Sequence, residues 1–355
     1  MRFAEVLDIR NGRNQRQVEN ENGKYPIYGS GGIMGRADDF LCEAETVVIG
    51  RKGSINNPIY VDEPFWNVDT AFGLVAHKDV LLPKYLYYFC VNFDFEKLNT
   101  TVTIPSLTKA NLLQIEISVP DMDKQRYIVG VLDRICHLIE LRQRELRELD
   151  QLVKSRFIEL FGAINDDVPL SYYIASLNAG KSLAGEEECP NKVLKTGAAT
   201  YDYFDATQVK NLPLDYEPQE DHRVSAGDVI ISRMNTAELV GAAAYVWDVP
   251  ERVYLPDRLW RAEIKDTANA IFVWQVLIQS STKESIRRIA SGTSGSMKNI
   301  SKPGLLGIRV VKAPKALQEQ FAAFVEQTDK SKLAVQQGLQ ELEILKKSLM
   351  QQYFG

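Results

Sequence analysis

Two short loops of the chain gather side chains that can read the bases of DNA. Each loop follows an apolar run, TVVIG in the first half and DVIIS in the second. Arginine can form a bidentate pair with guanine in the major groove, and asparagine can do the same with adenine. We therefore predict one base-reading loop in each half. The residues concerned are Arg51, Lys52, Ser54 and Asn56 in the first loop, and Arg233 and Asn235 in the second.

Glycine-rich turns and clustered cations supply a second kind of contact, to phosphates. Glycines let a backbone approach closely and expose its N–H donors, and the turns GSGG and SGTSGS fit that use. The alternative is a plain flexible turn. The residues predicted to contact DNA in this way are Gly29 and Ser30 with Arg10, Arg13 and Arg16 in the first half, and Ser294 and Ser296 with Lys283 and Lys298 in the second.

The overall composition limits the classes of protein that fit. The 355 residues carry a net charge of −5, which excludes a polycation that coats nucleic acid and leaves a patterned reader of DNA. No apolar run approaches the ~20 residues of a membrane span, and the N-terminus lacks a signal-peptide pattern. The four scattered cysteines are typical of free thiols in a reducing compartment. We expect a cytoplasmic protein that does not contact membranes.

Enzymatic alternatives have weaker support. The stretch NNPIY from Asn56 resembles a broken Asn-Pro-Pro-Tyr box of adenine-N6 methyltransferases, with Ile59 in place of the second proline. The only glycine-rich candidate for a cofactor loop, GSGGIMG, lacks a preceding apolar strand and a ribose-binding acid. The stretch GTSGS misses the nucleophile elbow because Ser296 stands where glycine is required. Metal-ligand spacing is absent. We predict no catalytic residue, cofactor or metal.

An internal repeat organises the elements that carry these loops. The ending SRFIELFG at Gly162 returns as SLMQQYFG at Gly355, 193 residues later, and the register holds without a gap for almost sixty residues. It places Lys109 on Lys302 and Gln125 on Gln318. Upstream the match needs gaps, with ETVVIGRKGS resembling GDVIISRMNT. Each copy is therefore a variable globular part followed by a well-matched tail.

The globular parts are predicted to be of mixed α+β structure. The runs TVVIG, NPIYV and AFGLVA are typical of strands, and the segment from Leu82 is typical of a helix with Pro83 in its first turn. The segment IPSLTKANLLQIEISVP predicts a loop, a helical turn and a strand. The second copy repeats this plan, with a helix over 270–279 and a strand GIRVV from Gly307.

The two tails are predicted to be long helices with heptad seams, each about 55 Å long. A single such helix cannot bury its seam, so we expect the two to pair, in antiparallel orientation. The alternative is that each helix packs only on its own globular part. The predicted seam residues are Ile128, Leu132, Ile135, Ile139, Leu146, Leu149 and Val153 in the first helix, and Phe321, Val325, Val335, Leu339, Leu342 and Leu349 in the second.

The order, duplication and spacing of these features resemble the specificity subunit of type I restriction–modification systems. The resemblance covers nearly the whole chain. It rests on YPIYGSGGIMGR, VVIGRKGSIN, IPSLTKANLLQIEISVP and the ending LVKSRFIELFG. In the second copy it rests on VIISRMNT, MKNISKPGLLGIRVVKAP and KKSLMQQYFG. No single motif is specific, but their order and repetition are.

The resemblance implies two target-recognition domains, at residues 1–120 and 163–312, each reading half of a split site in double-stranded DNA. It implies that the spacer helices 121–162 and 313–355 form an antiparallel coiled coil with pseudo-two-fold symmetry, on which two methyltransferase subunits dock and restriction subunits assemble. Three alternatives remain: a stand-alone adenine-N6 methyltransferase, the target-recognition protein of another restriction system, and a coiled-coil scaffold that binds only protein.

Overall fold

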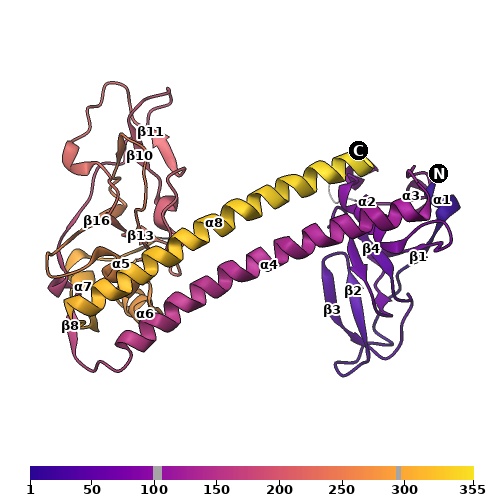
Figure 1. The fold of residues 1–355 in the computed structure, drawn as a ribbon, viewed down its shortest axis with the longest axis horizontal. Coiled ribbons are helices and arrows are strands. Elements are labelled where there is room, and N and C mark those ends of the chain that lie inside the picture. Colours follow the sequence, from indigo (N-terminus) through magenta and orange to yellow (C-terminus); the bar gives the residue numbers. More distant parts are fainter. Residues whose placement is uncertain (99–105, 293–296) are drawn as a thin grey trace. The chain divides into compact units, whose positions relative to one another are not determined.

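The computed structural model of the protein describes residues 1–98, 106–292 and 297–355 (Figure 1). The chain divides into two compact units. Unit 1 comprises Met1–Leu146 with Ala334–Gly355, and unit 2 comprises Arg147–Leu333. Each unit holds one globular head, the predicted target-recognition region, and a part of each of two forty-residue helices, α4 (Met122–Phe161) and α8 (Lys315–Phe354).

The head of unit 1 is built on a four-stranded antiparallel sheet in the order β1-β7-β4-β5 and a smaller sheet in the order β3-β2-β6. The three strands predicted from TVVIG, NPIYV and AFGLVA are confirmed as β4, β5 and β7. The elements are α1 (Phe3–Val6), β1 (Leu7–Asn11), β2 (Tyr25–Gly29), β3 (Gly32–Ala37), β4 (Thr46–Gly50), β5 (Ile59–Val61), β6 (Trp66–Asn67), β7 (Ala71–Ala76), α2 (Pro83–Asn92), η1 (Phe95–Leu98) and α3 (Lys109–Leu112).

The head of unit 2 repeats this plan with a sheet in the order β14-β12-β16-β9 and a smaller sheet β11-β10-β15. In both heads the smaller sheet contains one parallel pair, β2 with β6 and β10 with β15. The elements are β8 (Asp167–Pro169), η2 (Leu170–Tyr172), β9 (Ile174–Asn178), β10 (Lys192–Leu194), η3 (Thr196–Ala199), β11 (Val209–Asn211), η4 (Glu220–His222), β12 (Val229–Ser232), β13 (Met234–Asn235), β14 (Ala243–Tyr245), β15 (Val253–Tyr254), β16 (Leu259–Ile264), α5 (Ala270–Ile278), α6 (Ser280–Ile289), β17 (Lys298–Asn299), α7 (Lys302–Leu306) and β18 (Arg309–Val311).

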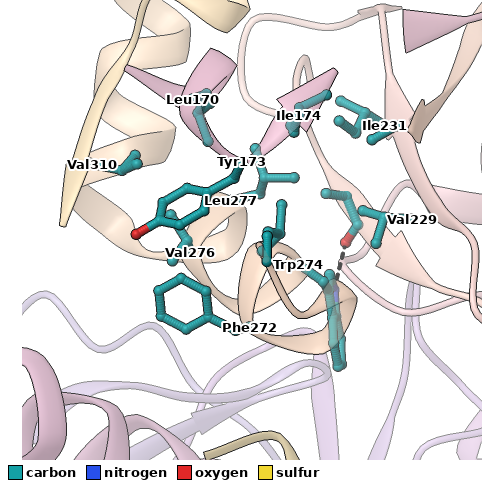
Figure 2. Packing of buried hydrophobic residues seen from close by; sticks show 14 of the residues in the cluster. Leu170, Tyr173, Ile174, Val229, Ile231, Phe272, Trp274, Val276, Leu277 and Val310 are labelled. Carbon is teal, nitrogen blue, oxygen red and sulfur yellow. Dashed lines mark hydrogen bonds between the residues drawn. The ribbon is translucent and has the colours of Figure 1, made fainter. Parts of the chain in front are cut away.

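The core of unit 2 forms where α5 covers the sheet (Figure 2). The helix is apolar all round, as expected of a buried helix, and its side chains pack against those of β9 and β12. Trp274 fits among them because its indole N–H donates to the Ala243 carbonyl oxygen at 3.0 Å. Tyr173 likewise satisfies its buried hydroxyl, which donates to the Val311 carbonyl oxygen at 2.9 Å.

The matched tails dock onto their heads through a pair of equivalent buried glutamines. The Leu82 N–H donates to Gln125 Oε1 at 2.8 Å, and the Asn269 N–H donates to Gln318 Oε1 at 3.0 Å. Leu82 and Asn269 are the N-cap residues of α2 and α5. Both glutamines are almost fully buried. Each glutamine therefore bonds an N–H group at the start of a head helix that has no partner within that helix. This bond holds each tail to its head.

We expect Gln125→Ala to lower the free energy of unfolding by about 3 kcal/mol, because it leaves buried donors and acceptors without partners. Gln318→Ala should have a similar effect on the second copy. Urea denaturation of the full chain measures both. Gln151→Ala on an exposed position of α4 is the matched control, and we expect it to change stability by less than about 0.5 kcal/mol. Equal losses in all three variants would contradict the role given to the buried pair.

The two long helices pack against each other in antiparallel orientation. In unit 1, Ile128 near the start of α4 and Met350 near the end of α8 belong to one core. In unit 2, Phe161 near the end of α4 contacts Phe321 near the start of α8, with ring centroids 5.5 Å apart. Every predicted seam residue is buried or half-buried. Lys332, which interrupts the seam, forms an ion pair with Asp150 of the other helix.

Two predicted elements differ from the structure. The helix expected from Leu82 to Leu98 ends at Asn92 and continues as the separate 3-10 helix η1. The strand expected in QIEISVP is only an isolated bridge, Arg2 with Glu116. Its equivalent in the second copy is a strand, β18, because β8 lies beside it as a full partner. No helix within the described parts of the chain is long and apolar enough to cross a membrane.

Candidate nucleic-acid interface

The predicted arginines Arg51 and Arg233 occupy equivalent positions in the two heads. The Arg51 N–H donates to the Thr70 carbonyl oxygen at 2.7 Å, and the Arg233 N–H donates to the Arg258 carbonyl oxygen at 3.0 Å. Each guanidinium lies over an aromatic ring of the next strand, Phe72 or Trp260, at 5.7 Å. This stacking restricts both guanidinium groups. The Arg51 guanidinium donates to no other described residue, whereas Arg233 Nε donates to Asn299 Oδ1 at 3.3 Å and keeps its remaining donors for a ligand.

The end of the main sheet at which these arginines lie will be called the arginine edge. It comprises residues 11–13, 50–54 and 69–72 in the first head, and residues 179–181, 232–235 and 256–259 in the second. The start of the gapless repeat, just before each long helix, closes the arginine edge in the same way in both heads. The Leu107 N–H donates to the Arg51 carbonyl oxygen at 2.9 Å, and the Ile300 N–H donates to the Arg233 carbonyl oxygen at 3.2 Å. Leu107 and Ile300 occupy the same position of the internal repeat, so the repeat itself positions both loops.

A second repeated feature of the arginine edge is a glycine followed by a cation. A β-carbon on Gly12 would lie 1.7 Å from the Val68 carbonyl oxygen, and one on Gly180 would lie 1.9 Å from that of Leu255. Only glycine fits such an approach. The cations that follow, Arg13 and Lys181, are exposed. The edge therefore presents a second basic side chain beside each loop arginine.

The predicted turn GSGG also reaches the arginine edge. A β-carbon on Gly50 would lie 3.1 Å from the Ser30 β-carbon, so the tip of the β2–β3 hairpin touches the start of the Arg51 loop. Beyond the tip, Ile33 is 67% exposed and Met34 is 61% exposed. Burial raises the pKa of Tyr28, just before the turn, so the phenol stays a neutral donor. The structure thus brings together the turn GSGG and the Arg51 loop, which were predicted separately.

Other predicted residues have partners inside the protein. The Asn56 side chain donates to Asp94 Oδ1 at 3.1 Å and accepts from the Phe95 N–H at 2.7 Å, which ties its loop to η1. Lys283 forms an ion pair with Asp202. Lys298 donates to the Gly292 carbonyl oxygen at 2.7 Å. These side chains hold loops near the edge.

The remaining predicted contacts lie in different surroundings. Arg10, Arg16, Lys52 and Ser54 are exposed and Asn235 is half-buried. The Asn235 amide donates to the Thr200 hydroxyl at 3.5 Å, which joins β13 to the segment after η3. Ser294 and Ser296 lie outside the described residues. Within the described ranges, groups of histidine, cysteine and acidic side chains that could hold a metal are absent.

Sequence reasoning missed three members of the arginine edge. Arg258 is exposed, forms no ion pair with another described residue, and supplies the carbonyl that holds Arg233. Gly180 and Lys181 repeat Gly12 and Arg13. The signal was present as the stretches RNGR and NAGK, but the gapless register of the tails does not align them.

The fold described above is that of type I restriction–modification specificity subunits. The crystal structure of the S subunit of such a system from M. genitalium matches it with a TM-score of 0.67, at 17% identity, over 100% of this chain and 95% of that one. Likeness at this identity concerns the fold alone. The two mixed α/β heads and the antiparallel pairing of the long helices, both predicted from the sequence, are confirmed.

Sequence similarity to proteins of this class covers part of the chain. Residues 1–151 match the family described as type I restriction modification DNA specificity domain. A type I restriction enzyme specificity subunit from Escherichia coli is 26% identical over 208 residues, which are 53% of this chain and 35% of that protein. A protein from Haemophilus influenzae described as such a subunit is 30% identical over 121 residues, 33% of this chain and 31% of that protein. Residues 1–151 are thus similar to the DNA specificity domains of type I restriction–modification systems.

The similarity does not extend over the whole of these relatives. The chain spans between about a third and about half of the length of the curated relatives it matches. The family model ends at residue 151, so it covers the first head and most of α4. The second head is linked to the first by the internal repeat and by the equivalent geometry of its arginine edge.

Proposed function

We propose that the chain is the DNA-recognition subunit of a type I restriction–modification complex. Its two heads, residues 1–120 and 163–312, would each read one half of a bipartite site in double-stranded DNA. The spacer helices, residues 121–162 and 313–355, would set the gap between the halves. The observation that carries this proposal is the arginine edge, which recurs with the same geometry in two heads of one chain.

The charge distribution supports a reader of DNA. Residues 1–120 carry 12 basic and 15 acidic side chains, and residues 163–312 carry 17 and 19, so neither head is positive as a whole. Exposed cations are nevertheless collected at the arginine edge, where Arg13, Arg51, Lys181 and Arg258 form no ion pair with another described residue. Locally concentrated positive charge suits phosphate contacts, and stacked arginine suits guanine.

In this function the chain carries no catalysis. Two adenine-N6 methyltransferase subunits would dock on the repeated helices, restriction subunits would join them, and the complex would act in the cytoplasm. The stand-alone methyltransferase reading relied on Asn56, and the hydrogen bonds of its amide to Asp94 and Phe95 count against a free adenine-binding side chain. If the chain were a scaffold that binds only protein, the repeated cations of the arginine edge would have no ligand.

The test is selection from a pool of random DNA duplexes by the full chain, purified in complex with the methyltransferase subunits proposed above. We expect enrichment of two short specific half-sites separated by a gap of fixed length, with affinity falling steeply as salt rises. Enrichment of one continuous motif, or of none, would refute the proposal. Binding that does not depend on salt would favour the protein-binding scaffold.

A further inference from the structure

The tip beside the second arginine edge is built differently from that of the first. In the first head it is the β2–β3 hairpin, with exposed Ile33 and Met34. In the second head β10 leads into η3 and then into a short loop, Tyr201–Tyr203, that no motif in the sequence singled out. Thr200, just before this loop, accepts a hydrogen bond from Asn235 of the arginine edge.

The loop presents two aromatic rings to solvent. Tyr201 is 67% exposed and Tyr203 is 57% exposed, and their rings stack with centroids 6.3 Å apart. No hydrogen bond from either phenol to another described residue is present. Tyrosine is enriched at interfaces because its ring is apolar and its hydroxyl is polar. A tyrosine can contact a thymine methyl or a sugar with its ring and a base edge with its hydroxyl.

The residue between the two rings fixes the loop. Asp202 has a φ of 65°, in the left-handed region that few residues other than glycine adopt. It is held there by an ion pair with Lys283 of α6, in which the two side chains are only 26% and 23% exposed. The Ala243 N–H also donates to its carboxylate at 3.4 Å. The ion pair therefore holds the loop in an uncommon backbone conformation and anchors it to α6, which is distant in the sequence.

The surroundings of the loop leave it accessible and well supported at its base. Tyr201, Asp202 and Lys283 line a hollow of about 440 Å³ together with Glu238 and Arg287. On the other side, the Thr207 hydroxyl donates to Asp205 at 2.6 Å, which holds the pKa of that carboxyl below its usual value. Hydrogen bonds therefore hold the residues on both sides of the loop, while the rings of Tyr201 and Tyr203 remain exposed to solvent.

We propose that Tyr201 and Tyr203 determine specificity by contacting bases of the second half-site, and that Lys283 is a positioning residue that holds them through Asp202. The inference rests on the proposed function and deepens it. The occupant is double-stranded DNA, because the loop adjoins the cations of the arginine edge. Lys283 then acts within the protein and does not contact phosphate.

The experiment uses the full chain in complex with its methyltransferase subunits. Binding is measured for duplexes that carry each single base change in either half of the selected site. We expect Tyr201→Ala with Tyr203→Ala to reduce discrimination about tenfold or more at positions of the second half only. The salt dependence should not change, because no cation is removed. Tyr172→Ala, which removes an exposed tyrosine elsewhere in this head, is the matched control.

Variants of the ion pair separate positioning from phosphate contact. Lys283→Met should relax the same positions as the tyrosine variants and leave the salt dependence unchanged. Lys283→Arg keeps the cation that pairs with Asp202, and it should retain discrimination. If Lys283→Met instead weakens binding to all sequences equally and lowers the salt slope by about one, Lys283 contacts phosphate and the positioning role is wrong.

Two further outcomes would overturn the proposal for the tyrosines. Unchanged base preferences in the tyrosine variants would show that the loop does not read DNA, even though the wild-type complex selects a bipartite site. Loss of methyltransferase subunits with unchanged preferences would make the loop a protein interface. If the wild-type complex selects no bipartite site, the proposed function itself fails. These results are distinguishable in one set of measurements.

Discussion

Arg51→Ala is expected to relax base preference in one half of the recognised site and to leave the other half unchanged. Arg51 is exposed, and its guanidinium is held over Phe72 and donates to no other described residue. A bidentate contact to guanine is worth about 1–3 kcal/mol of discrimination, which corresponds to a loss of roughly 10- to 100-fold at one position. Arg51→Lys should lose most of this discrimination as well, because lysine cannot form the bidentate pair.

Arg233→Ala is expected to do the same in the other half. The two arginines occupy equivalent positions, yet their neighbours differ, since Arg233 also donates from Nε to Asn299 Oδ1 at 3.3 Å. The measurement is the affinity of the full complex for the selected duplex and for its single-base variants. The pair of substitutions would therefore assign each half-site to one head.

The controls lie at the opposite end of the same sheets. Lys78 follows the far end of β7, where it pairs with Glu45, and Lys265 follows the far end of β16. Lys78→Ala and Lys265→Ala remove the same charge away from the arginine edge, and we expect base preference to stay unchanged. If either control relaxes a half-site as strongly as Arg51→Ala or Arg233→Ala, the interface has been placed at the wrong end of the sheet.

The parts of the structure that the sequence predicted are those with an unbroken pattern. The gapless register of the repeat placed Gln125 on Gln318, and the structure gives both the same buried hydrogen-bonding role. Heptad periodicity and the absence of proline predicted α4 and α8 almost to their ends. These features depend on local pattern and spacing, which a single sequence displays directly.

The parts that escaped prediction depend on contacts between distant segments. Gly12 and Gly180 are equivalent, but insertions of different length in the two heads remove them from the common register. Lys283 was predicted to contact DNA because it is basic and close to a glycine-rich turn. Its pairing with Asp202 depends on how α6 packs against a loop far earlier in the chain, and no spacing rule reports that.

The repeat also indicates the helix surface on which each of the two methyltransferase subunits would dock. Leu152 of α4 and Leu345 of α8 occupy the same position of the repeat, and they are 48% and 46% exposed. Exposed glutamates, Glu148 and Glu341, lie one turn before them on the same helix face. An apolar side chain kept exposed at both copies of one position suggests a binding surface used twice.

Leu152→Arg and Leu345→Arg are each expected to remove one methyltransferase subunit from the complex. A buried charge at the centre of an interface is costly, so the affinity at the altered copy should fall at least about tenfold. Mass measurement of the purified complex should show two methyltransferase subunits for the wild type, one for each single variant and none for the double variant. Neither substitution should change which bases are read.

The matched controls are exposed apolar residues that the repeat does not preserve. Ile158 is 66% exposed and aligns with Gln351, and Ile344 is 70% exposed and aligns with Gln151. We expect Ile158→Arg and Ile344→Arg to retain both subunits. If these controls lose a subunit while the leucine variants keep two, exposure alone and not the repeat would mark the docking surface. If one leucine variant loses both subunits, binding at the two copies is coupled, and independent docking on equivalent helix faces is wrong.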